Sequence, residues 1–356
     1  MNRKKFYGAA LCAAMVLPLF TNCSKNDDDE QIENPTVPSE YIYVLNSGNW
    51  GNNDATLSMY NVEDEVVTGD IFETQNGYRL GDTGNDIIVY GSKIYIAMTV
   101  DNSIWITDLE AKVIQRISAE GQPRYFAAYE GKVYVSFING NVSRIDTATL
   151  AIEASVKVGR NPEQLAAVNG KLYVANSGGQ DFPNYDKTVS VVDLQSFTEI
   201  KKIDVFLNPV NMAADDQGNI FLVSNGDYSA PGVVQKINTQ NDAVSELDVN
   251  GSYLTLPGGN TLYLISSEYD ENFNLSLYYY SYDILQNRLL SDNFKGNTQF
   301  LAFPIQISSD KISGEIYIGT SDYINTGDVY VFDKNGNFSY SFEAGLNPIK
   351  AVKISK

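Results

Sequence analysis

The sequence predicts an all-β protein, a seven-bladed β-propeller of four-stranded blades that is closed by its C-terminal strand. Two observations carry this prediction: a unit of about 45 residues that recurs seven times, and a surplus strand at the C-terminus. Composition agrees with an all-β fold. The chain of 356 residues holds 24 Tyr and 16 Phe, which belong with Val, Ile and Thr to the residue types that fit a pleated, half-buried surface.

Each unit contains a strand in which an aromatic residue is followed by Val, Ile or Leu. The seven pairs are Tyr43-Val44, Tyr95-Ile96, Tyr134-Val135, Tyr173-Val174, Phe221-Leu222, Tyr263-Leu264 and Tyr317-Ile318. The next strand of each unit is expected to end at Asn61, Asp108, Asp146, Asp193, Asn238, Asp283 or Asp333. Gly or Asn in the short turns around these strands is a hairpin signal.

The ends of the repeat array predict how the ring closes. The first strand of a blade begins beside a proline in four units, at Pro123, Pro162, Pro209 and Pro304. The same signal returns at Pro348, but no blade follows it, while Tyr41 opens directly on a second strand. The C-terminal strand is therefore predicted to complete blade one, because this pairs two otherwise open sheet edges.

The N-terminus carries the features of an export leader. Residues 1–22 have a basic start followed by an apolar run from Phe6 to Phe20, which is too short to span a bilayer. Cys23 follows in a sequence that resembles a lipobox, the site at which a thiol is acylated. Several acyl chains on one Cys make a stable membrane anchor.

Residues 23–40 are predicted to be the lipidated Cys and a flexible tether, which leaves residues 41–356 for the propeller. The tether has almost no large apolar residue, so it cannot bury enough surface to order itself. Its acidic run 27–30 resembles the export signal of Bacteroides-type lipoproteins. We therefore expect an outer-membrane protein that is anchored by lipid and exposed at the cell surface.

Composition excludes several functions. The chain has no His, and its two Cys are Cys12 in the leader and Cys23. Histidine-based catalysis, thiol nucleophiles and thiolate metal sites are therefore excluded from the body of the protein. We expect no enzyme activity, cofactor or metal site. The net charge of -19 repels phosphate backbones, so nucleic acid is not expected as a partner. The propeller itself is expected to be monomeric.

The loops that connect strands two and three, and those that connect neighbouring blades, share one face of a propeller. On this face the loops are long and irregular, which marks it for function. They are Asn46–Ala55, Phe72–Asn85, Asn176–Thr188, Ser224–Gly232, Ser266–Ser276 and Thr320–Asp328. The hairpins of the opposite face are short. First strands such as 164–167 and 211–214 look built for packing.

Aromatic side chains in these loops are the main candidates for ligand contact, although each one alone could be a packing residue. They are Trp50, Tyr78, Phe182, Tyr185, Tyr228, Tyr269, Phe273 and Tyr323.

Polar candidates lie on the same face. Asn46 and Asn176 share a register at the ends of second strands, where they either bind an amide-rich ligand or cap a turn. Arg124 and Arg160 flank prolines and either meet an anionic group of the ligand or form interblade salt bridges. Arg79 is a further basic candidate beside Tyr78.

The leader, Cys23 with its acidic run, and the motif Tyr-Val-Ala-Asn-Ser-Gly-Gly at 173–179 together resemble the surface propeller lipoproteins of gut Bacteroides-type bacteria. Within that group the chain is most similar to the cobalamin-binding BtuG family, although YncE-like propellers share the motif. The resemblance implies that the protein binds vitamin B12 or a related corrinoid and passes it to a TonB-dependent outer-membrane transporter. A glycan receptor, a protein-binding scaffold and a metal-dependent lactonase or lyase are the alternatives.

Overall fold

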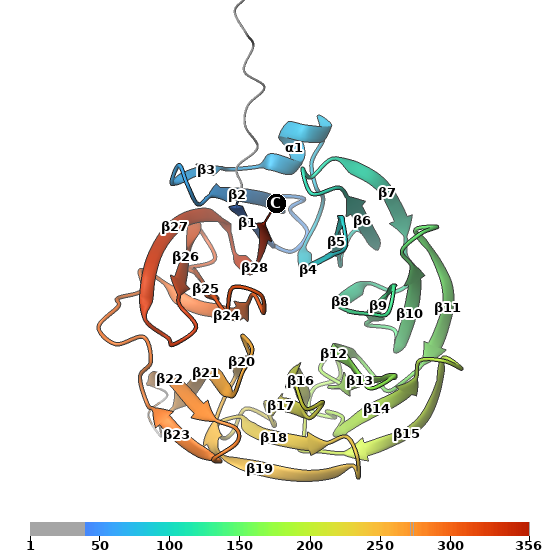
Figure 1. Ribbon diagram of the computed structural model, residues 1–356, viewed down its shortest axis with the longest axis vertical. Helices are drawn as coiled ribbons and strands as arrows, with labels where there is room; N and C mark the ends of the chain where they lie inside the picture. Colours follow the sequence, from blue (N-terminus) through green and yellow to red (C-terminus); the bar gives the residue numbers. More distant parts are fainter. Residues whose placement is uncertain (1–39, 271, 273, 356) are drawn as a thin grey trace, which may run out of the picture. The chain divides into compact units, whose positions relative to one another are not determined.

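The computed structural model describes residues 40–270, 272 and 274–355. The predicted leader, Cys23, most of the predicted tether and Phe273 lie outside this part of the chain. The described residues form twenty-eight strands and one helix. The strands make seven four-stranded antiparallel sheets that follow one another around a ring, as Figure 1 shows. The seven-bladed propeller predicted from the sequence is therefore confirmed.

The blades follow the order of the chain, with the innermost strand given first. Blade one consists of β28 (Pro348–Ser355), β1 (Glu40–Asn46), β2 (Thr56–Asn61) and β3 (Val66–Thr68). Blade two consists of β4 (Gly84–Tyr90), β5 (Lys93–Met98), β6 (Ser103–Thr107) and β7 (Val113–Ser118). Blade three consists of β8 (Pro123–Tyr129), β9 (Lys132–Phe137), β10 (Asn141–Asp146) and β11 (Ala151–Lys157).

The other four blades repeat this pattern. Blade four consists of β12 (Pro162–Val168), β13 (Lys171–Asn176), β14 (Thr188–Asp193) and β15 (Thr198–Asp204). Blade five consists of β16 (Pro209–Ala214), β17 (Ile220–Ser224), β18 (Val233–Asn238) and β19 (Ala243–Asn250). Blade six consists of β20 (Tyr253–Thr255), β21 (Thr261–Tyr269), β22 (Leu275–Asp283) and β23 (Arg288–Ser291). Blade seven consists of β24 (Phe303–Ser309), β25 (Ile316–Ser321), β26 (Thr326–Phe332) and β27 (Phe338–Leu346).

The C-terminal strand closes the ring as predicted. β28 runs antiparallel to β1, with Glu40 opposite Ser355 and Leu45 opposite Lys350. The ammonium of Lys353 on β28 lies 3.0 Å from carboxylate oxygens of both Glu40 and Glu315. Glu315 belongs to blade seven, so this residue joins the closing strand to two blades.

The core lies between the blades. The described residues contain seven hydrophobic clusters, and each one fills the space between two neighbouring blades. The aromatic residue of every predicted strand pair is buried, with at most 2% of its surface exposed; these residues are Tyr43, Tyr95, Tyr134, Tyr173, Phe221, Tyr263 and Tyr317. Each stands on the second strand of its blade. Burying one large ring per blade gives a rigid support for the loops.

Two strands end one residue earlier than predicted, because the Asp that was expected to end each strand is the first residue of the turn. β6 ends at Thr107, and the carboxylate of Asp108 accepts a hydrogen bond from the backbone N–H of Lys112 at 2.8 Å. β26 ends at Phe332, and Asp333 accepts from the backbone N–H of Asn337 at 2.9 Å. Such side-chain bonds compete with the ladder and favour turns.

A short helix, α1 (Ile71–Asn76), lies in the segment between blades one and two that was expected to be loop. Asp70 caps its N-terminus by accepting a hydrogen bond from the Glu73 N–H at 3.2 Å. Gly77 ends it with a positive φ of 77°, which a Gly adopts without strain. The spacing of Asp70 and Glu73 is that of a capping box, so the signal was present in the sequence.

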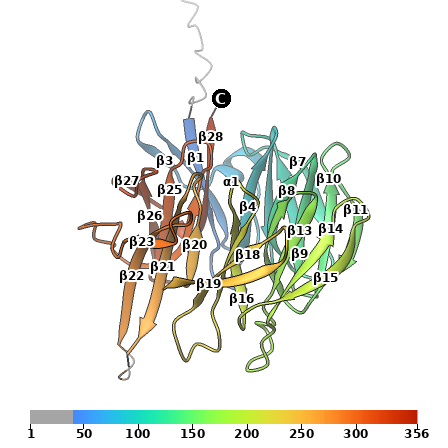
Figure 2. The ribbon, with the colours of Figure 1, turned by 60° about the horizontal axis from the view of Figure 1, so that its bottom comes forward.

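The loops lie on the predicted face, which we call the long-loop face. Loops 47–55, 177–187 and 225–232 are long, whereas 99–102 and 138–140 of blades two and three are short. β21 and β22 continue through most of the expected loop of blade six and leave only 270–274 between them. Figure 2 shows these loops on the side of the ring opposite the start of β1.

Candidate functional site: the long-loop face and the central channel

Aromatic side chains are exposed on the long-loop face. Those with 60% or more of their surface exposed are Trp50, Phe182, Tyr228, Tyr269 and Tyr323. They belong to blades one, four, five, six and seven. Exposed large rings gathered on one face of a soluble domain mark a binding surface more often than chance exposure does.

Three of the predicted aromatic residues are in contact. The rings of Phe182 and Tyr185 meet edge to face at 6.0 Å between centroids, and Tyr185 meets Tyr228 edge to face at 6.1 Å. The group joins the loops of blades four and five. The Asn208 amide also donates to the Tyr228 hydroxyl at 3.4 Å. These contacts order the rings before any ligand arrives, which lowers the entropic cost of binding.

The predicted anion-binding role of Arg160 is not supported, because its guanidinium is already paired. Its Nη1 lies 2.7 Å from a carboxylate oxygen of Asp181, and its Nη2 donates to the Asn184 carbonyl at 2.7 Å. Both partners belong to the loop that carries Phe182 and Tyr185. Arg160 therefore holds this aromatic loop in place.

Arg124 is likewise committed to an interblade salt bridge. Its Nη2 lies 2.7 Å from the carboxylate of Glu163 in blade four, and its Nη1 donates to the Asn85 side chain of blade two at 2.6 Å. Burial, the largest single effect, lowers the pKa of Arg124, but Glu163, Tyr125 and Asp86 together outweigh it, so the pKa is raised. The expectation that Arg124 meets an anionic ligand group is corrected.

Asn46 and Asn176 share a register as predicted, but both side chains are fully buried. The Asn46 amide donates to Thr56 Oγ1 at 3.0 Å and to Ser58 Oγ at 2.8 Å, and it accepts from the Gly345 N–H at 2.9 Å. Asn176 repeats this arrangement in blade four. Their role as ligand contacts is therefore wrong: an amide at this position fastens the second strand to its neighbours.

The fold uses the ring of Tyr78 for packing, whereas the side chain of Arg79 is exposed and can contact a ligand. The ring of Tyr78 packs on Phe72 and Trp105, with centroids 5.9 and 5.8 Å away, so it is partly structural. Arg79 is exposed, and its Nη1 makes one long hydrogen bond of 3.4 Å to the Asn53 carbonyl. No carboxylate of the described residues forms an ion pair with Arg79, so its charge remains available.

The loop that carries Trp50 is fastened to the segment that follows α1. The Gly51 N–H donates to Asp82 Oδ1 at 3.1 Å, and Arg79 reaches the carbonyl of Asn53 in the same loop. Trp50 and Arg79 therefore lie in segments that contact each other. They form a second group of exposed residues, separate from the group of blades four and five.

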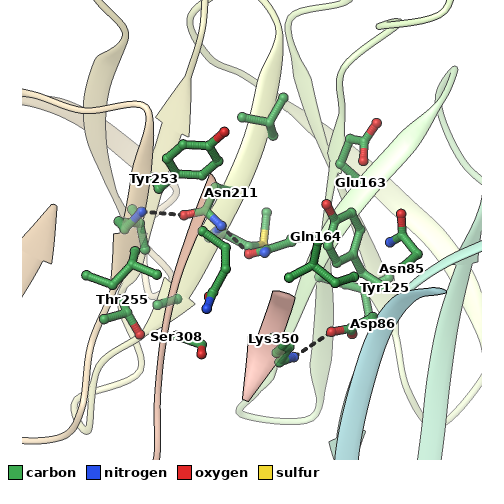
Figure 3. Close-up of a pocket in the computed structure, with 18 of the residues that line it drawn as sticks. Asn85, Asp86, Tyr125, Glu163, Gln164, Asn211, Tyr253, Thr255, Ser308 and Lys350 are labelled. Atoms are coloured by element: carbon green, nitrogen blue, oxygen red, sulfur yellow. Dashed lines mark hydrogen bonds and ion pairs between the residues drawn. The ribbon is translucent and has the colours of Figure 1, made fainter. Parts of the chain in front are cut away.

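A central channel runs through the ring and has a cavity volume of about 870 Å³. It is lined by the first strands of all seven blades (Figure 3). Ser177, Asn208 and Tyr228 line its end on the long-loop face, and Asp310 and Lys311 line its other end. Tyr228 thus belongs both to the aromatic group and to the channel.

Seven polar residues, one from each first strand, line this cavity, and we call them the channel belt. They are Asp86, Tyr125, Gln164, Asn211, Tyr253, Gln306 and Lys350. In five blades the belt residue stands two positions after the proline that begins the strand, a signal that the sequence contained. The first strands 164–167 and 211–214, which looked built for packing, serve it in part: Leu165 and Met212 are buried, but Gln164 and Asn211 line the channel.

Three belt side chains accept a hydrogen bond from the backbone of the next blade. Asp86 Oδ2 accepts from the Phe126 N–H at 2.7 Å, and Gln164 Oε1 accepts from the Met212 N–H at 2.9 Å. Asn211 makes the same kind of bond to blade six (Figure 3). These bonds fix the orientation of each carboxylate or amide.

Belt electrostatics keep the tyrosines neutral. Burial raises the pKa of Tyr253 to about 12, with smaller contributions from Tyr323 and Tyr228, and burial also raises the pKa of Tyr125. Both phenols therefore keep their protons at neutral pH. Burial raises the pKa of Asp86 as well, against the opposing effect of the Lys350 ammonium.

Among residues 40–270, 272 and 274–355, no group of three or more His, Cys, Asp or Glu is placed to hold a metal ion. The helix of this part of the chain is not long and apolar enough to cross a membrane.

The protein is a seven-bladed propeller, and aromatic side chains on its long-loop face lie at one end of a polar central channel. Residues 40–268 match the family described as "Domain of unknown function (DUF5074)", and the chain belongs to this family. No curated protein matches it.

Among solved structures, the chain is similar to hydrazine synthase of Kuenenia stuttgartiensis, with 16% identity and a TM-score of 0.60 over 69% of this chain and 74% of that one. It also matches apo AztD from Citrobacter koseri, with 11% identity and a TM-score of 0.49 over 88% of this chain and 97% of that one. At sequence identities this low, the similarity extends to the fold and not to the function.

Proposed function

We propose that this protein is a binding protein and not an enzyme, and that its long-loop face captures a corrinoid such as cobalamin. The observation that carries this proposal is the ordered group Phe182, Tyr185 and Tyr228, in which Phe182 and Tyr228 are exposed and Tyr228 lines the end of the channel. Rigid aromatic anchors give large contact area at low entropic cost, which is typical of hot spots.

The chemistry of a corrinoid suits this surface. A corrinoid is wide, partly apolar, fringed with amides and carries one phosphate. Exposed rings on five blades offer apolar contact over a wide area, and Tyr hydroxyls can bond to amides. Arg79 lies in the group with Trp50, and its guanidinium can pair with the phosphate of the corrinoid.

The proposal includes the surface location and the transporter. Glu40 begins β1 on the face opposite the long loops (Figure 2), so a lipid anchor at Cys23 would join the propeller from that side. We propose that the ligand approaches the long-loop face, which lies opposite Glu40. In this proposal the bound corrinoid passes to a TonB-dependent outer-membrane transporter.

Titration calorimetry of the full-length protein with cyanocobalamin tests the proposal. We expect one-to-one binding, and a pink protein that keeps its colour after desalting. Absence of heat with cyanocobalamin, together with clear heat from an oligosaccharide, would assign the exposed rings to a glycan receptor instead. Absence of heat with both ligands would favour a protein-binding scaffold.

A further inference from the structure

Four neighbouring polar groups of the channel belt, in addition to the Gln306 amide, have no hydrogen-bond partner among the described residues. They are the hydroxyls of Tyr125 and Tyr253 and the side-chain NH₂ groups of Gln164 and Asn211. None of them forms a hydrogen bond within the described chain, although all four residues line the cavity (Figure 3). They come from blades three, four, five and six, and thus form one continuous arc.

The orientation of the two amides is fixed by the blades themselves. The oxygen of Gln164 accepts from the Met212 N–H, and the oxygen of Asn211 accepts from the Leu254 N–H at 2.6 Å. Each NH₂ group is therefore left as a donor that is not needed for the fold. A polar group in a channel that lacks a protein partner needs another one, either water or a ligand.

The two phenols add hydroxyl groups that stay protonated. Burial raises the pKa of both Tyr125 and Tyr253 above the usual value for tyrosine. A neutral phenol can both donate and accept a hydrogen bond. The arc thus offers two amide donors and two hydroxyls to whatever occupies the channel.

The charges near the arc are already balanced. The Lys350 ammonium lies 2.6 Å from the Asp86 carboxylate, and Arg124 pairs with Glu163 at 2.7 Å. Lys311 also lines the cavity and forms no ion pair among the described residues, but it lies at the end of the channel opposite the long-loop face. A charged ligand at the level of the arc would therefore find no free counter-charge beside it and would lose its hydration without compensation. The belt therefore favours a neutral ligand with many oxygen atoms.

We infer that the central channel is a second binding site, and that it takes a small neutral polyhydroxylated molecule of the size of a monosaccharide. Its volume of about 870 Å³ falls in the range of about 300–1,000 Å³ that is usual for small-molecule sites. Hydroxyl groups of such a molecule would accept from the two amides and exchange hydrogen bonds with the two phenols. This site does not depend on what the long-loop face binds.

Saturation-transfer difference NMR on the full-length protein tests the inference, with D-glucose, D-galactose and myo-inositol as probes at millimolar concentration. We expect a signal from at least one probe. Tyr125→Phe and Tyr253→Phe should each weaken binding of that probe by about tenfold, the loss of one hydrogen bond of about 1.4 kcal/mol. Tyr278→Phe is the matched control, because Tyr278 is an exposed tyrosine of β22 and should leave the signal unchanged.

Two results with the sugar probes would overturn the inference. One is the absence of signal from all three probes, and the other is equal binding by the parent and both Phe variants while their melting temperatures agree. Binding of inorganic phosphate in place of the sugars would also contradict a neutral ligand. A cyanocobalamin titration of the same two variants separates the sites, since corrinoid affinity should not change in either.

Discussion

The ammonium of Lys350 donates a hydrogen bond of 2.6 Å to Asp86 Oδ1, and the Asp86 side chain is only 2% exposed. Lys350 belongs to β28, the strand that closes blade one, and Asp86 belongs to β4 of blade two. The same carboxylate accepts from the backbone N–H of Phe126 in blade three. One buried carboxylate therefore joins three consecutive blades at the point where the ring closes.

Lys350→Met should destabilise the propeller by about 3 kcal/mol, because it leaves the Asp86 carboxylate buried without a counter-charge. The loss should shrink as the pH falls. The pKa of Asp86 lies above its usual value in the folded protein, so the folded state binds more protons than the unfolded state at mildly acidic pH. Urea unfolding at several pH values measures both effects.

The control for this pair is the double variant Lys350→Met with Asp86→Asn. Asn keeps an acceptor for the Phe126 N–H but carries no charge, so most of the lost stability should return. If the double variant is as unstable as Lys350→Met alone, the ion pair is not the cause.

Deletion of residues 349–356 should lower the melting temperature strongly. It removes most of β28, exposes the edge of β1 and takes away Lys353, which pairs with Glu40 and Glu315. Calorimetry measures the change, and a shift of less than about 2 °C would contradict the closure. As a control, a synthetic peptide of residues 348–355 should restore part of the stability when it is added to the truncated protein.

The protein should unfold between pH 10 and pH 12. Burial raises the pKa of several phenols in the core to about 12; they belong to Tyr41, Tyr95, Tyr263 and Tyr279. Between the unfolded value of about 10 and this folded value, the unfolded chain releases protons that the folded protein retains. Stability is therefore fully present below pH 10 and falls above it.

Circular dichroism and the near-ultraviolet absorbance of tyrosinate, followed together, check this alkaline transition. The absorbance of the buried tyrosines should rise only as the β-sheet signal is lost. Complete titration of all tyrosines with an unchanged β-sheet signal would show that these phenols are not buried.

Trp50→Ala and Tyr185→Ala should each weaken binding of cyanocobalamin by about 30-fold, since truncation of an aromatic anchor commonly costs about 2 kcal/mol. Neither ring belongs to a core cluster, so the melting temperature should stay nearly the same. Ile312→Ala is the control, because Ile312 is 95% exposed on the opposite face. Equal affinity of all three variants would exclude these rings from the site.

Cys23→Ala should release the protein from membranes, because the acyl chains on this Cys would supply the anchoring energy. Membrane fractionation of cells that lack the partner transporter measures the effect. Cys12→Ala is the matched control and should remain with the membranes, since Cys12 lies within the predicted leader. Persistent membrane association of the Cys23 variant would contradict lipidation at this position.

The fold was predictable because each blade repeats a few strong local signals. A buried Tyr such as Tyr173 and a proline such as Pro162 recur at fixed intervals, and both follow from the geometry of the strand they occupy. Closure was predictable because one first strand was left over. Repetition thus compensated for the weakness of any single strand signal.

The site was predictable only in part, since a sequence position does not reveal the partners of a side chain. The long loops correctly located exposed rings such as Phe182, but Asn46 and Arg160 are both used by the fold. Their partners, Ser58 and Asp181, are brought near by the sheet and the loop conformation. The channel belt was missed because Gln164 and Asn211 stand among apolar residues. They are far apart in the sequence, and only the folded seven-bladed ring brings them together.

The pairing of β28 with β1 also determines the order in which the molecule can be completed. Asn46 and Gly345, which are joined by a hydrogen bond, stand 299 residues apart, so the ring has contacts of very high sequence separation. Contacts of this kind form late and make folding slow. Until β28 has left the ribosome, blade one is a three-stranded sheet with an open inner edge. During this interval a second nascent chain can add its own strand there, so slower synthesis should favour intermolecular pairing over closure.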